Sequence, residues 1–207
     1  DIMKILVIGG TGLIGSSVVD LLKNKNPESE IISAGFNNGD VTVDISQQSS
    51  IKKMYEDVGK LDAVIMTTGK VKFAPLNELD SECYALGLEN KLMGQVNVVR
   101  LGLDYINDNG SFTLTSGILN HEPIYMGASA AMVNGAIDGF VTGAAIELPR
   151  GIRINTVSPT VVTEALGKYD SFFPGFESVD VNYVANAYRK SVSGLFTGKV
   201  IRVGYSL

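Results

Sequence analysis

The residues with the clearest chemical meaning lie in the first twenty positions of the chain. Gly10, Gly12 and Gly15 fit the pattern G-x-G-x-x-G, and they lie between an apolar run at 3–8 and an amphipathic segment at 16–23. In a turn from a strand to a helix, such glycines let the backbone approach a pyrophosphate, and the unpaired N–H groups of the helix end bind the anion. The motif therefore predicts a bound dinucleotide. The alternative is a glycine-rich turn without a ligand.

Strand and helix patterns alternate along the chain, as in a sheet whose parallel strands are joined by helices. Strands are predicted at 3–8, 30–35, 41–45, 61–66, 112–116, 152–157 and 199–203. Helices are predicted at 16–23, 46–58, 81–106, 128–148 and 181–191, from apolar residues at helical spacing. We expect an α/β fold in which residues 1–207 form a single Rossmann domain. Its doubly wound parallel sheet would have about seven strands, with helices on both faces.

Composition limits the class of protein and its partners. A net charge of −5 and a pI near 4.9 give no basic surface for nucleic acid. Cys83 is the only cysteine and His121 the only histidine, so we expect no disulfide within the chain and no metal site. No apolar run has the length of a membrane span, and a reducing compartment is the simplest setting for one cysteine. The expectation is a cytoplasmic protein that binds neither nucleic acid nor a membrane.

The order of motifs resembles that of the short-chain dehydrogenase/reductase family over nearly the whole chain. The matching segments are 9–15, Val43-Asp44-Ile45, Thr67-Thr68-Gly69, Thr115-Ser116, and Glu147 to Asn155 running into Ser158-Pro159. The last segment is the most specific, because it matches residue by residue across a helix end and a strand. The resemblance implies a seven-stranded Rossmann sheet, an NAD(P)(H) cofactor and a homodimer or homotetramer.

The resemblance also assigns cofactor contacts to individual positions. The pyrophosphate and the adjoining ribose would lie on Gly9, Gly10, Thr11, Gly12, Leu13 and Ile14. The adenine would lie beside Asp44 and Ile45, and the second ribose along Thr67, Thr68 and Gly69. The carboxamide would be held by Pro159, Val162 and Thr163, although Thr160 replaces a family glycine and the threonine comes one position early. Considered singly, Asp44 could be a solvated strand end, and Thr67 and Thr68 could be ordinary turn residues.

The end of the second predicted strand bears on the choice between NAD and NADP. An acid there would accept a hydrogen bond from the ribose 2′-hydroxyl and repel a 2′-phosphate. The segment from Gly35 to Asn38 holds no acid, and it also lacks the arginine that often neutralises the phosphate. Asn37 and Asn38 could donate hydrogen bonds to a phosphate, and Phe36 could stack on the adenine. We therefore favour NADP(H) over NAD(H).

The catalytic positions depart from the family pattern. The resemblance places the usual tyrosine at Ala130, the usual lysine at Asn134 and the usual helix asparagine at Lys91, and the chain contains no Y-x-x-x-K. Ser116 alone keeps its identity. If Lys91 and Asn134 face one another, a buried ammonium remains near the nicotinamide, and burial can lower a lysine pKa far enough for acid–base work. Our hypothesis is that Lys91, with Ser116 and Asn134, replaces the tyrosine as the proton donor. The alternative is that Lys91 only fills the space and bonds the ribose and helix carbonyls.

The function that the resemblance implies is an NAD(P)-dependent oxidoreductase that transfers a hydride to or from a small carbonyl or alcohol compound. One alternative is a non-catalytic dinucleotide-binding protein, for sensing or assembly, that has lost the catalytic tyrosine and lysine. Another is a structural homo-oligomer without a cofactor.

Other segments are weaker candidates for a role in the site. Residues 164–179 are rich in aromatic side chains, and we predict that they cover an apolar or aromatic ligand or else form a subunit contact. Tyr125 could enter the site, although a packing role is the simpler interpretation, and His121 is expected to be an exposed turn residue. Lys70 and Lys72 could attract an anionic substrate or lie in a solvated loop.

Overall fold

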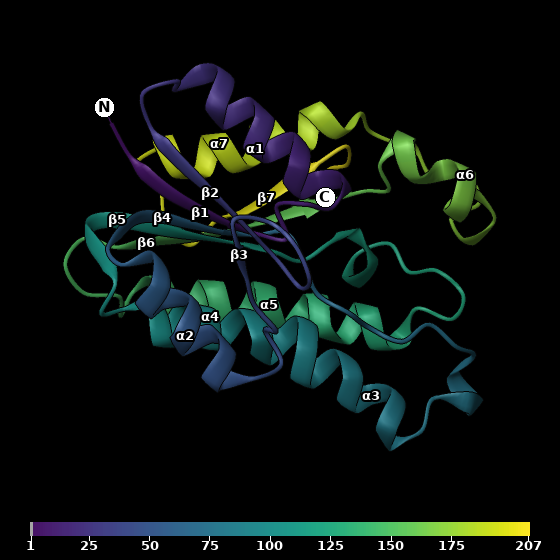
Figure 1. Cartoon of the computed structure of the whole chain (residues 1–207). Coiled ribbons are helices and arrows are strands. Elements are labelled where there is room, and N and C mark those ends of the chain that lie inside the picture. Colours follow the sequence, from purple (N-terminus) through teal and green to yellow (C-terminus); the bar gives the residue numbers. More distant parts are fainter. Residues whose placement is uncertain (1) are drawn as a thin grey trace.

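The computed structural model of the protein describes residues 2–207, and its centre is a sheet of seven strands (Figure 1). The strands are β1 (Lys4–Ile8), β2 (Glu30–Gly35), β3 (Val41–Thr42), β4 (Leu61–Met66), β5 (Ile106–Thr115), β6 (Arg153–Pro159) and β7 (Val200–Val203). They lie in the order β3-β2-β1-β4-β5-β6-β7, and every neighbouring pair is parallel. The strand order reverses direction between β1 and β4, which confirms the predicted doubly wound Rossmann sheet.

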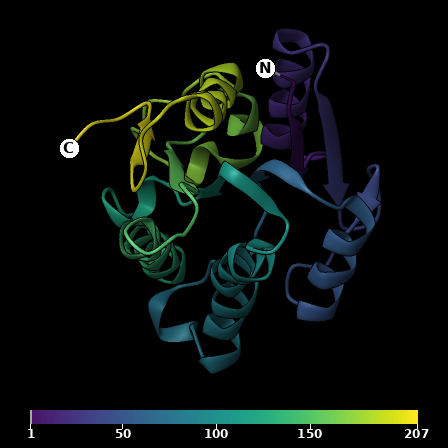
Figure 2. The ribbon, with the colours of Figure 1, turned by 90° about the vertical axis from the view of Figure 1, so that its left-hand side faces the viewer.

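Helices cover both faces of this sheet, as Figures 1 and 2 show from two directions. One face carries α1 (Leu13–Lys25) and α7 (Val181–Ser193), and the opposite face carries α2 (Gln48–Val58), α4 (Met93–Gly102) and α5 (Ala128–Ala145). The chain enters α4 through α3 (Ser81–Gly87) and the π-helical segment η2 (Leu88–Leu92), and α6 (Leu166–Tyr169) follows β6. Short 3₁₀ turns are η1 (Leu76–Glu78), η3 (Ile118–Asn120), η4 (Thr163–Ala165) and η5 (Asp170–Phe172). Within residues 2–207, no helix has the length and apolar character needed to cross a membrane.

The apolar run of β1 shows why these residues form a central strand. Ile5, Leu6, Val7 and Ile8 are all at most 1% exposed. Leu6 and Ile8 pack in the layer with α2, α4 and α5, whereas Ile5 and Val7 pack in the layer with α1 and α7. Since side chains alternate along a strand, burial on both faces requires an unbroken apolar run. Each such side chain contributes roughly 1.5–3 kcal/mol of burial free energy.

The largest departure from the predicted elements is the segment 81–106, which is not one helix. It divides into α3, η2 and α4, and Ile106 already belongs to β5. Gly94, at the start of α4, packs so closely that a Cβ there would lie 2.8 Å from Ile45 Cδ1. Helical periodicity does not distinguish α from π turns, and π turns occur frequently at functional sites. Lys91 lies within this π-helical segment.

Two strands also differ in length from the prediction. β3 ends at Thr42 because the chain turns at Asp44, whose Oδ1 accepts a hydrogen bond of 3.0 Å from the backbone N–H of Ser46. β5 begins at Ile106, six residues before the predicted start at 112, across the polar segment Asn107–Asn109. That segment pairs irregularly with β4, where the register shifts between Leu61 and Ala63. Polar residues at an irregular sheet end carry no apolar pattern, so no strand could be predicted at 106–111.

Candidate active site

The turn from β1 to α1 holds glycines that admit no side chain. Gly9 has a φ of 85°, and a Cβ there would lie 2.5 Å from the hydroxyl oxygen of Thr67. A Cβ on Gly15 would overlap the carbonyl oxygen of Gly9. Gly12 precedes α1 and offers no side chain to cap its first N–H groups. The turn is thus packed tightly against β4 while the helix N-terminus stays open to an anion.

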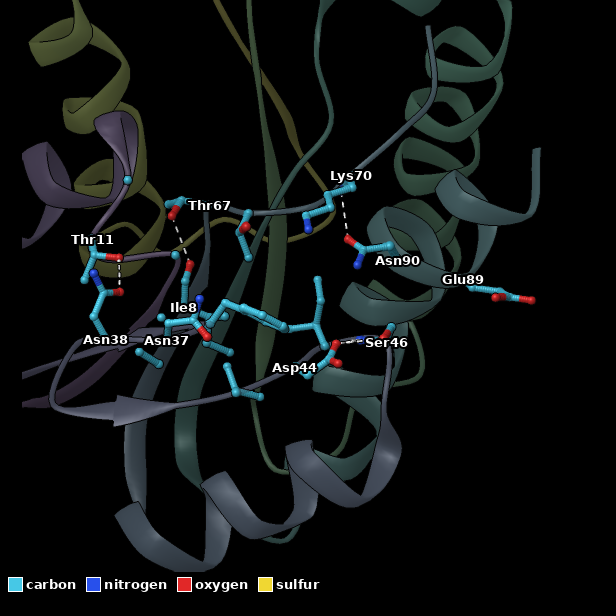
Figure 3. A pocket seen from close by; sticks show the side chains of 18 of the residues that line it. Ile8, Thr11, Asn37, Asn38, Asp44, Ser46, Thr67, Lys70, Glu89 and Asn90 are labelled. Atoms are coloured by element: carbon cyan, nitrogen blue, oxygen red, sulfur yellow. Dashed lines mark hydrogen bonds between the residues drawn. The ribbon is translucent and has the colours of Figure 1, made fainter. Parts of the chain in front are cut away.

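A groove of about 590 Å³ opens beside this turn, and Figure 3 shows the side chains that line it. The predicted cofactor positions among its lining residues are Gly9, Thr11, Gly12, Phe36, Asn37, Asp44, Ile45, Thr67 and Thr68, with Asn38 beside them. The predicted positions outside the lining are Gly10, Leu13, Ile14, Gly69, Lys91, Pro159, Val162 and Thr163. The volume is within the range of small-molecule and cofactor sites.

Outside the strands and the motif segments that resemble the family, five further lining residues had no predicted cofactor role. They are Ser46, Lys70, Leu86, Glu89 and Asn90. Leu86, Glu89 and Asn90 belong to α3 and η2, which lie beside the carboxyl end of β4. In open α/β sheets, ligands bind at the carboxyl ends of the strands where the strand order reverses, and this topology was the available signal for these residues.

Hydrogen bonds between loops give the groove its shape. Thr11 Oγ1 donates to Asn38 Oδ1 at 2.9 Å, so the amide group of Asn38 keeps its two N–H donors for another partner. The backbone N–H of Lys70 donates to Asn90 Oδ1 at 2.7 Å. The Lys70 ammonium then lies 5.6 Å from the ring centre of Phe36, which is 63% exposed. A cation and an aromatic face therefore meet across the groove.

The structure brings Lys91, Ser116 and Asn134 together. Lys91 Nζ donates to Asn134 Oδ1 at 2.7 Å and to the carbonyl oxygen of Ser116 at 2.9 Å. Its stem packs on Gly69, where a Cβ would lie 2.7 Å from Lys91 Cγ. The three residues come from η2, from the end of β5 and from α5, so their contact depends on the fold and not on local sequence.

Burial alters the ammonium of Lys91. It lowers the pKa of Lys91 from 10.5 to about 8, and the charge of Asp138 opposes this change. An ammonium with a pKa near 8 is largely protonated at neutral pH and still gives up its proton readily. Two of its three N–H donors are bonded to Asn134 and Ser116, which leaves one donor for a further partner.

The residues around this ammonium are buried. Ser116, Ala130 and Asn134 are each at most 3% exposed. Ser116 Oγ accepts a hydrogen bond of 3.4 Å from Thr156 Oγ1. Ala130, in the first turn of α5, packs in a small apolar cluster with Ile118 and Leu119. Position 130, where the resemblance places the family tyrosine, thus carries a small apolar side chain.

The segment after β6 forms a loop whose two ends, at 162–163 and 178–179, bond to each other. Val162 pairs with Val179 in an isolated parallel bridge, and Thr163 Oγ1 bonds Ser178 Oγ at 2.8 Å. Between these ends, Tyr169, Phe172 and Phe173 line an apolar cavity of about 270 Å³ together with Phe73, Ile124 and Val161. Val162 and Thr163, which were predicted to hold the carboxamide, therefore also hold together the two ends of the aromatic segment.

The remaining candidates differ in their surroundings. Tyr125 is 77% exposed. His121 is not a fully exposed turn residue as predicted: its side chain is 23% exposed, and its Nε2 lies 3.7 Å from Asp138 Oδ2. In the part of the chain that the structure describes, no group of three or more His, Cys, Asp or Glu side chains is arranged to hold a metal ion.

The chain has a Rossmann fold with a groove at the carboxyl ends of its central strands, the place where such folds bind nucleotides. The sequence model of the family described as enoyl-(acyl carrier protein) reductase matches residues 17–190. The chain belongs to this family of oxidoreductases, within the short-chain dehydrogenases/reductases.

Two solved structures are similar along almost the whole chain. The protein lin1944 from Listeria innocua shares 54% sequence identity, with a TM-score of 0.94 over 97% of this chain and 98% of that one. A small-chain dehydrogenase in complex with NADPH shares 26% identity, with a TM-score of 0.86 over 98% of this chain and 97% of that one.

Curated relatives match over a shorter stretch. An uncharacterized oxidoreductase of Methylorubrum extorquens is 28% identical over 60% of this chain and 51% of its own length. Hydroxynaphthalene reductase of Aspergillus fumigatus is 29% identical over 59% of this chain and 45% of its own length. The chain spans about half the length of these two relatives.

Proposed function

We propose that this protein is an NADP(H)-dependent oxidoreductase that reduces a small carbonyl compound, or oxidises the corresponding alcohol, with Lys91 as the proton donor. The observation that carries the proposal is the Lys91 ammonium, which is held by Ser116 and Asn134 and has a lowered pKa. Membership of an oxidoreductase family and the NADPH bound to a similar dehydrogenase support the cofactor assignment.

The residues of the groove fit a dinucleotide. Gly9 and Gly15 leave no space for side chains where the backbone must approach a pyrophosphate, and α1 offers its open N-terminus. Phe36 and Asp44 provide an aromatic face and a carboxylate for an adenine. When bound, the nicotinamide supplies the hydride.

The remaining chemistry belongs to the chain's own residues. As the substrate carbonyl carbon gains the hydride, the C=O π electrons move to the oxygen, which takes a proton from the Lys91 ammonium and becomes a hydroxyl. Asn134 and Ser116 hold the lysine at two of its donors, so its third N–H can point at that oxygen. In the oxidation direction, neutral Lys91 accepts the alcohol proton.

The aromatic residues after β6 indicate the kind of substrate. Tyr169, Phe172 and Phe173 line an apolar cavity of about 270 Å³. An aromatic or branched aliphatic carbonyl compound would bury apolar surface there, which favours binding by about 25 cal/mol for each Å². We also propose, from the family resemblance, a cytoplasmic homodimer or homotetramer.

The proposal is tested by titration of the protein with NADPH and NADH, followed by a screen of aliphatic and aromatic aldehydes and ketones in the same sample. We expect NADPH to bind and at least one aromatic carbonyl compound to be reduced. Failure to bind either cofactor would overturn the proposal. Tight NADPH binding without turnover on any compound would instead favour a non-catalytic dinucleotide-binding protein.

Lys70 gives a separate prediction about the choice of cofactor. Its ammonium lines the groove beside Phe36 and near Asn37 and Asn38, and the segment from Gly35 to Asn38 holds no acid. A hydrogen bond to a charged group contributes about 1.5–3 kcal/mol, so K70M should weaken NADPH binding by roughly 10- to 100-fold. NADH, which lacks the phosphate, should bind K70M and the wild type alike. Fluorescence titration of both cofactors measures the ratio.

The matched control for this substitution is K72M. Lys72 is an exposed lysine two residues further along the same loop, and it is outside the groove lining. K72M should leave both affinities within about twofold of the wild type, as expected of a surface change. Equal weakening of NADPH and NADH by K70M would show that Lys70 acts on the shared part of the cofactor and not on the phosphate.

A further inference from the structure

Tyr205, in the segment that follows β7, reaches back to the sheet beside the position of the missing tyrosine. Its hydroxyl is hydrogen-bonded to Ser158 Oγ, and Ser158 is fully buried near the end of β6. Its ring packs against the apolar cluster of Ile118, Leu119 and Ala130. A phenol from the segment after β7 therefore packs against the cluster that contains Ala130, the position at which the resemblance places the family tyrosine.

The strand register places this phenol close to Ser116. Thr115 pairs with Val157, and the backbone N–H of Ser116 donates to the carbonyl oxygen of Val157 at 3.0 Å. Ser116 and Ser158 are thus neighbours across the parallel strands β5 and β6, since adjacent strands lie about 4.7–4.9 Å apart. Since side chains alternate along a strand, Ser158 shares its face with Thr156, which bonds Ser116 Oγ. The Tyr205 hydroxyl is thus bonded to the serine that lies opposite Ser116, and the Lys91 ammonium is bonded to the carbonyl oxygen of Ser116 itself.

The surroundings of Tyr205 keep its hydroxyl protonated. Burial raises the pKa of Tyr205 above its ordinary value; the charges of Asp138 and Glu122 add to this, while the bond to Ser158 and the charge of Arg202 oppose it. At neutral pH the phenol is therefore an O–H donor and not a base. With Ser158 as the donor to the phenol oxygen, the phenol proton is left for a ligand.

Two further groups restrict the movement of this side chain. The ring of His121 lies 6.2 Å from that of Tyr205, centre to centre. His121 Nε2 lies 3.7 Å from Asp138 Oδ2, and Asn120 Nδ2 donates to the same oxygen at 2.9 Å. The polar cluster that includes Asp138 and His121 thus borders the phenol on the side of α5.

We propose that the Tyr205 hydroxyl donates a hydrogen bond to the substrate oxygen, and so takes over the stabilising part of the role that the family tyrosine lost at position 130. Lys91 still supplies the proton, and Ser158 positions the phenol. This inference rests on the proposed reductase function. It assigns a second catalytic residue to a segment that no motif in the sequence identified.

The test compares the Y205F and S158A variants with the wild type in the reduction of the best carbonyl substrate by NADPH. Removal of one hydrogen-bond donor to a developing oxyanion lowers kcat by about 100- to 1,000-fold, so Y205F should lose about 100-fold in kcat. KM and the Kd of NADPH should stay within about threefold, because the donor acts on the transition state. S158A keeps the phenol but loses its partner, and a loss of about tenfold in kcat is expected. The control is Y183F, since Tyr183 is 70% exposed on α7.

The outcomes separate this inference from the proposed function. A Y205F variant with kcat within about threefold of the wild type overturns the inference alone. A Y205F variant that loses NADPH affinity together with kcat also overturns it, because the residue is then structural. If Y205F does not fold, S158A decides: reduced kcat with normal NADPH binding supports the inference, and wild-type kcat overturns it. A wild type that reduces no carbonyl compound overturns the proposed function, and this inference with it.

Discussion

K91M should lose about 1,000-fold in kcat for carbonyl reduction, since a positioned general acid contributes about 100- to 10,000-fold. The methionine fills similar space, but it offers no proton and no donor to Asn134 Oδ1 or to the Ser116 carbonyl, which the ammonium bonds at 2.7 and 2.9 Å. Single-turnover and steady-state assays with NADPH measure the loss. K72M, which removes an exposed lysine, is the control and should retain full activity.

K91R separates the proton donor from a space-filling or purely electrostatic role. Arginine keeps the positive charge and the donors of Lys91, but its guanidinium does not give up a proton at the pH of an assay. If Lys91 is the acid, K91R should be nearly as inactive as K91M. If Lys91 only fills the space and bonds its neighbours, K91R should recover a large share of the activity. Turnover of K91M equal to that of the wild type would remove Lys91 from the mechanism altogether.

The lowered pKa of Lys91 also fixes the sign of the pH dependence. Burial brings this pKa from 10.5 to about 8, so the ammonium form is present below about pH 8 and is lost above it. The kcat of reduction should therefore be constant on the acid side and fall as the pH rises through about 8. The kcat of alcohol oxidation, which needs the neutral amine, should rise over the same interval. Both profiles are measured from about pH 6 to 10 with saturating cofactor.

A substitution at Asp138 should change the pH at which the reduction rate falls. Its negative charge raises the pKa of Lys91 and so opposes the effect of burial. D138N should therefore shift the descending limb of the reduction profile to lower pH. A limb that stays in place in D138N, or moves to higher pH, would show that the titrating group is not Lys91.

The fold could be predicted from the sequence because the apolar patterns of its strands and helices are local and recur along the chain. β2 and β4 occupy the predicted ranges, since each is a short apolar run between turn residues. The single predicted helix at 81–106 was wrong for a local reason as well. Apolar spacing indicates a helix over 81–106, but it does not distinguish the π turn of η2 from an α turn.

The residues of the candidate site could be predicted from the sequence only where a motif or an exchange of residue types marked them. By the family resemblance, Lys91 and Asn134 have exchanged residue types, and this was visible in the sequence before their contact was known. Tyr205 and Ser158 are 47 residues apart and belong to no shared pattern. Their contact follows from the path of the chain after β7, and sequence spacing carries no information on that path. The lysine–aromatic pair of Lys70 and Phe36 was missed for the same reason.

G15A should abolish measurable NADPH binding while the protein stays folded. A Cβ at Gly15 overlaps the carbonyl oxygen of Gly9, a backbone atom that cannot swing away, so the β1–α1 turn must open. Overpacking of this kind costs roughly 1–3 kcal/mol, which is less than the 5–15 kcal/mol stability of ordinary domains. The opened turn, however, no longer aims its N–H groups at the pyrophosphate, and a loss of more than about 100-fold in affinity follows from the loss of several charge-assisted bonds.

The control for this substitution is G139A, in the middle of α5. Gly139 is exposed, and a Cβ there meets no atom within 4 Å, so the change tests the effect of a glycine-to-alanine substitution without a clash. Alanine has the higher helix propensity, and G139A should be more stable than the wild type by up to about 1 kcal/mol with unchanged NADPH affinity. Calorimetric titration and thermal unfolding of both variants provide the comparison. If G15A binds NADPH as tightly as G139A does, the cofactor does not lie on the glycine turn, and the groove must serve another ligand.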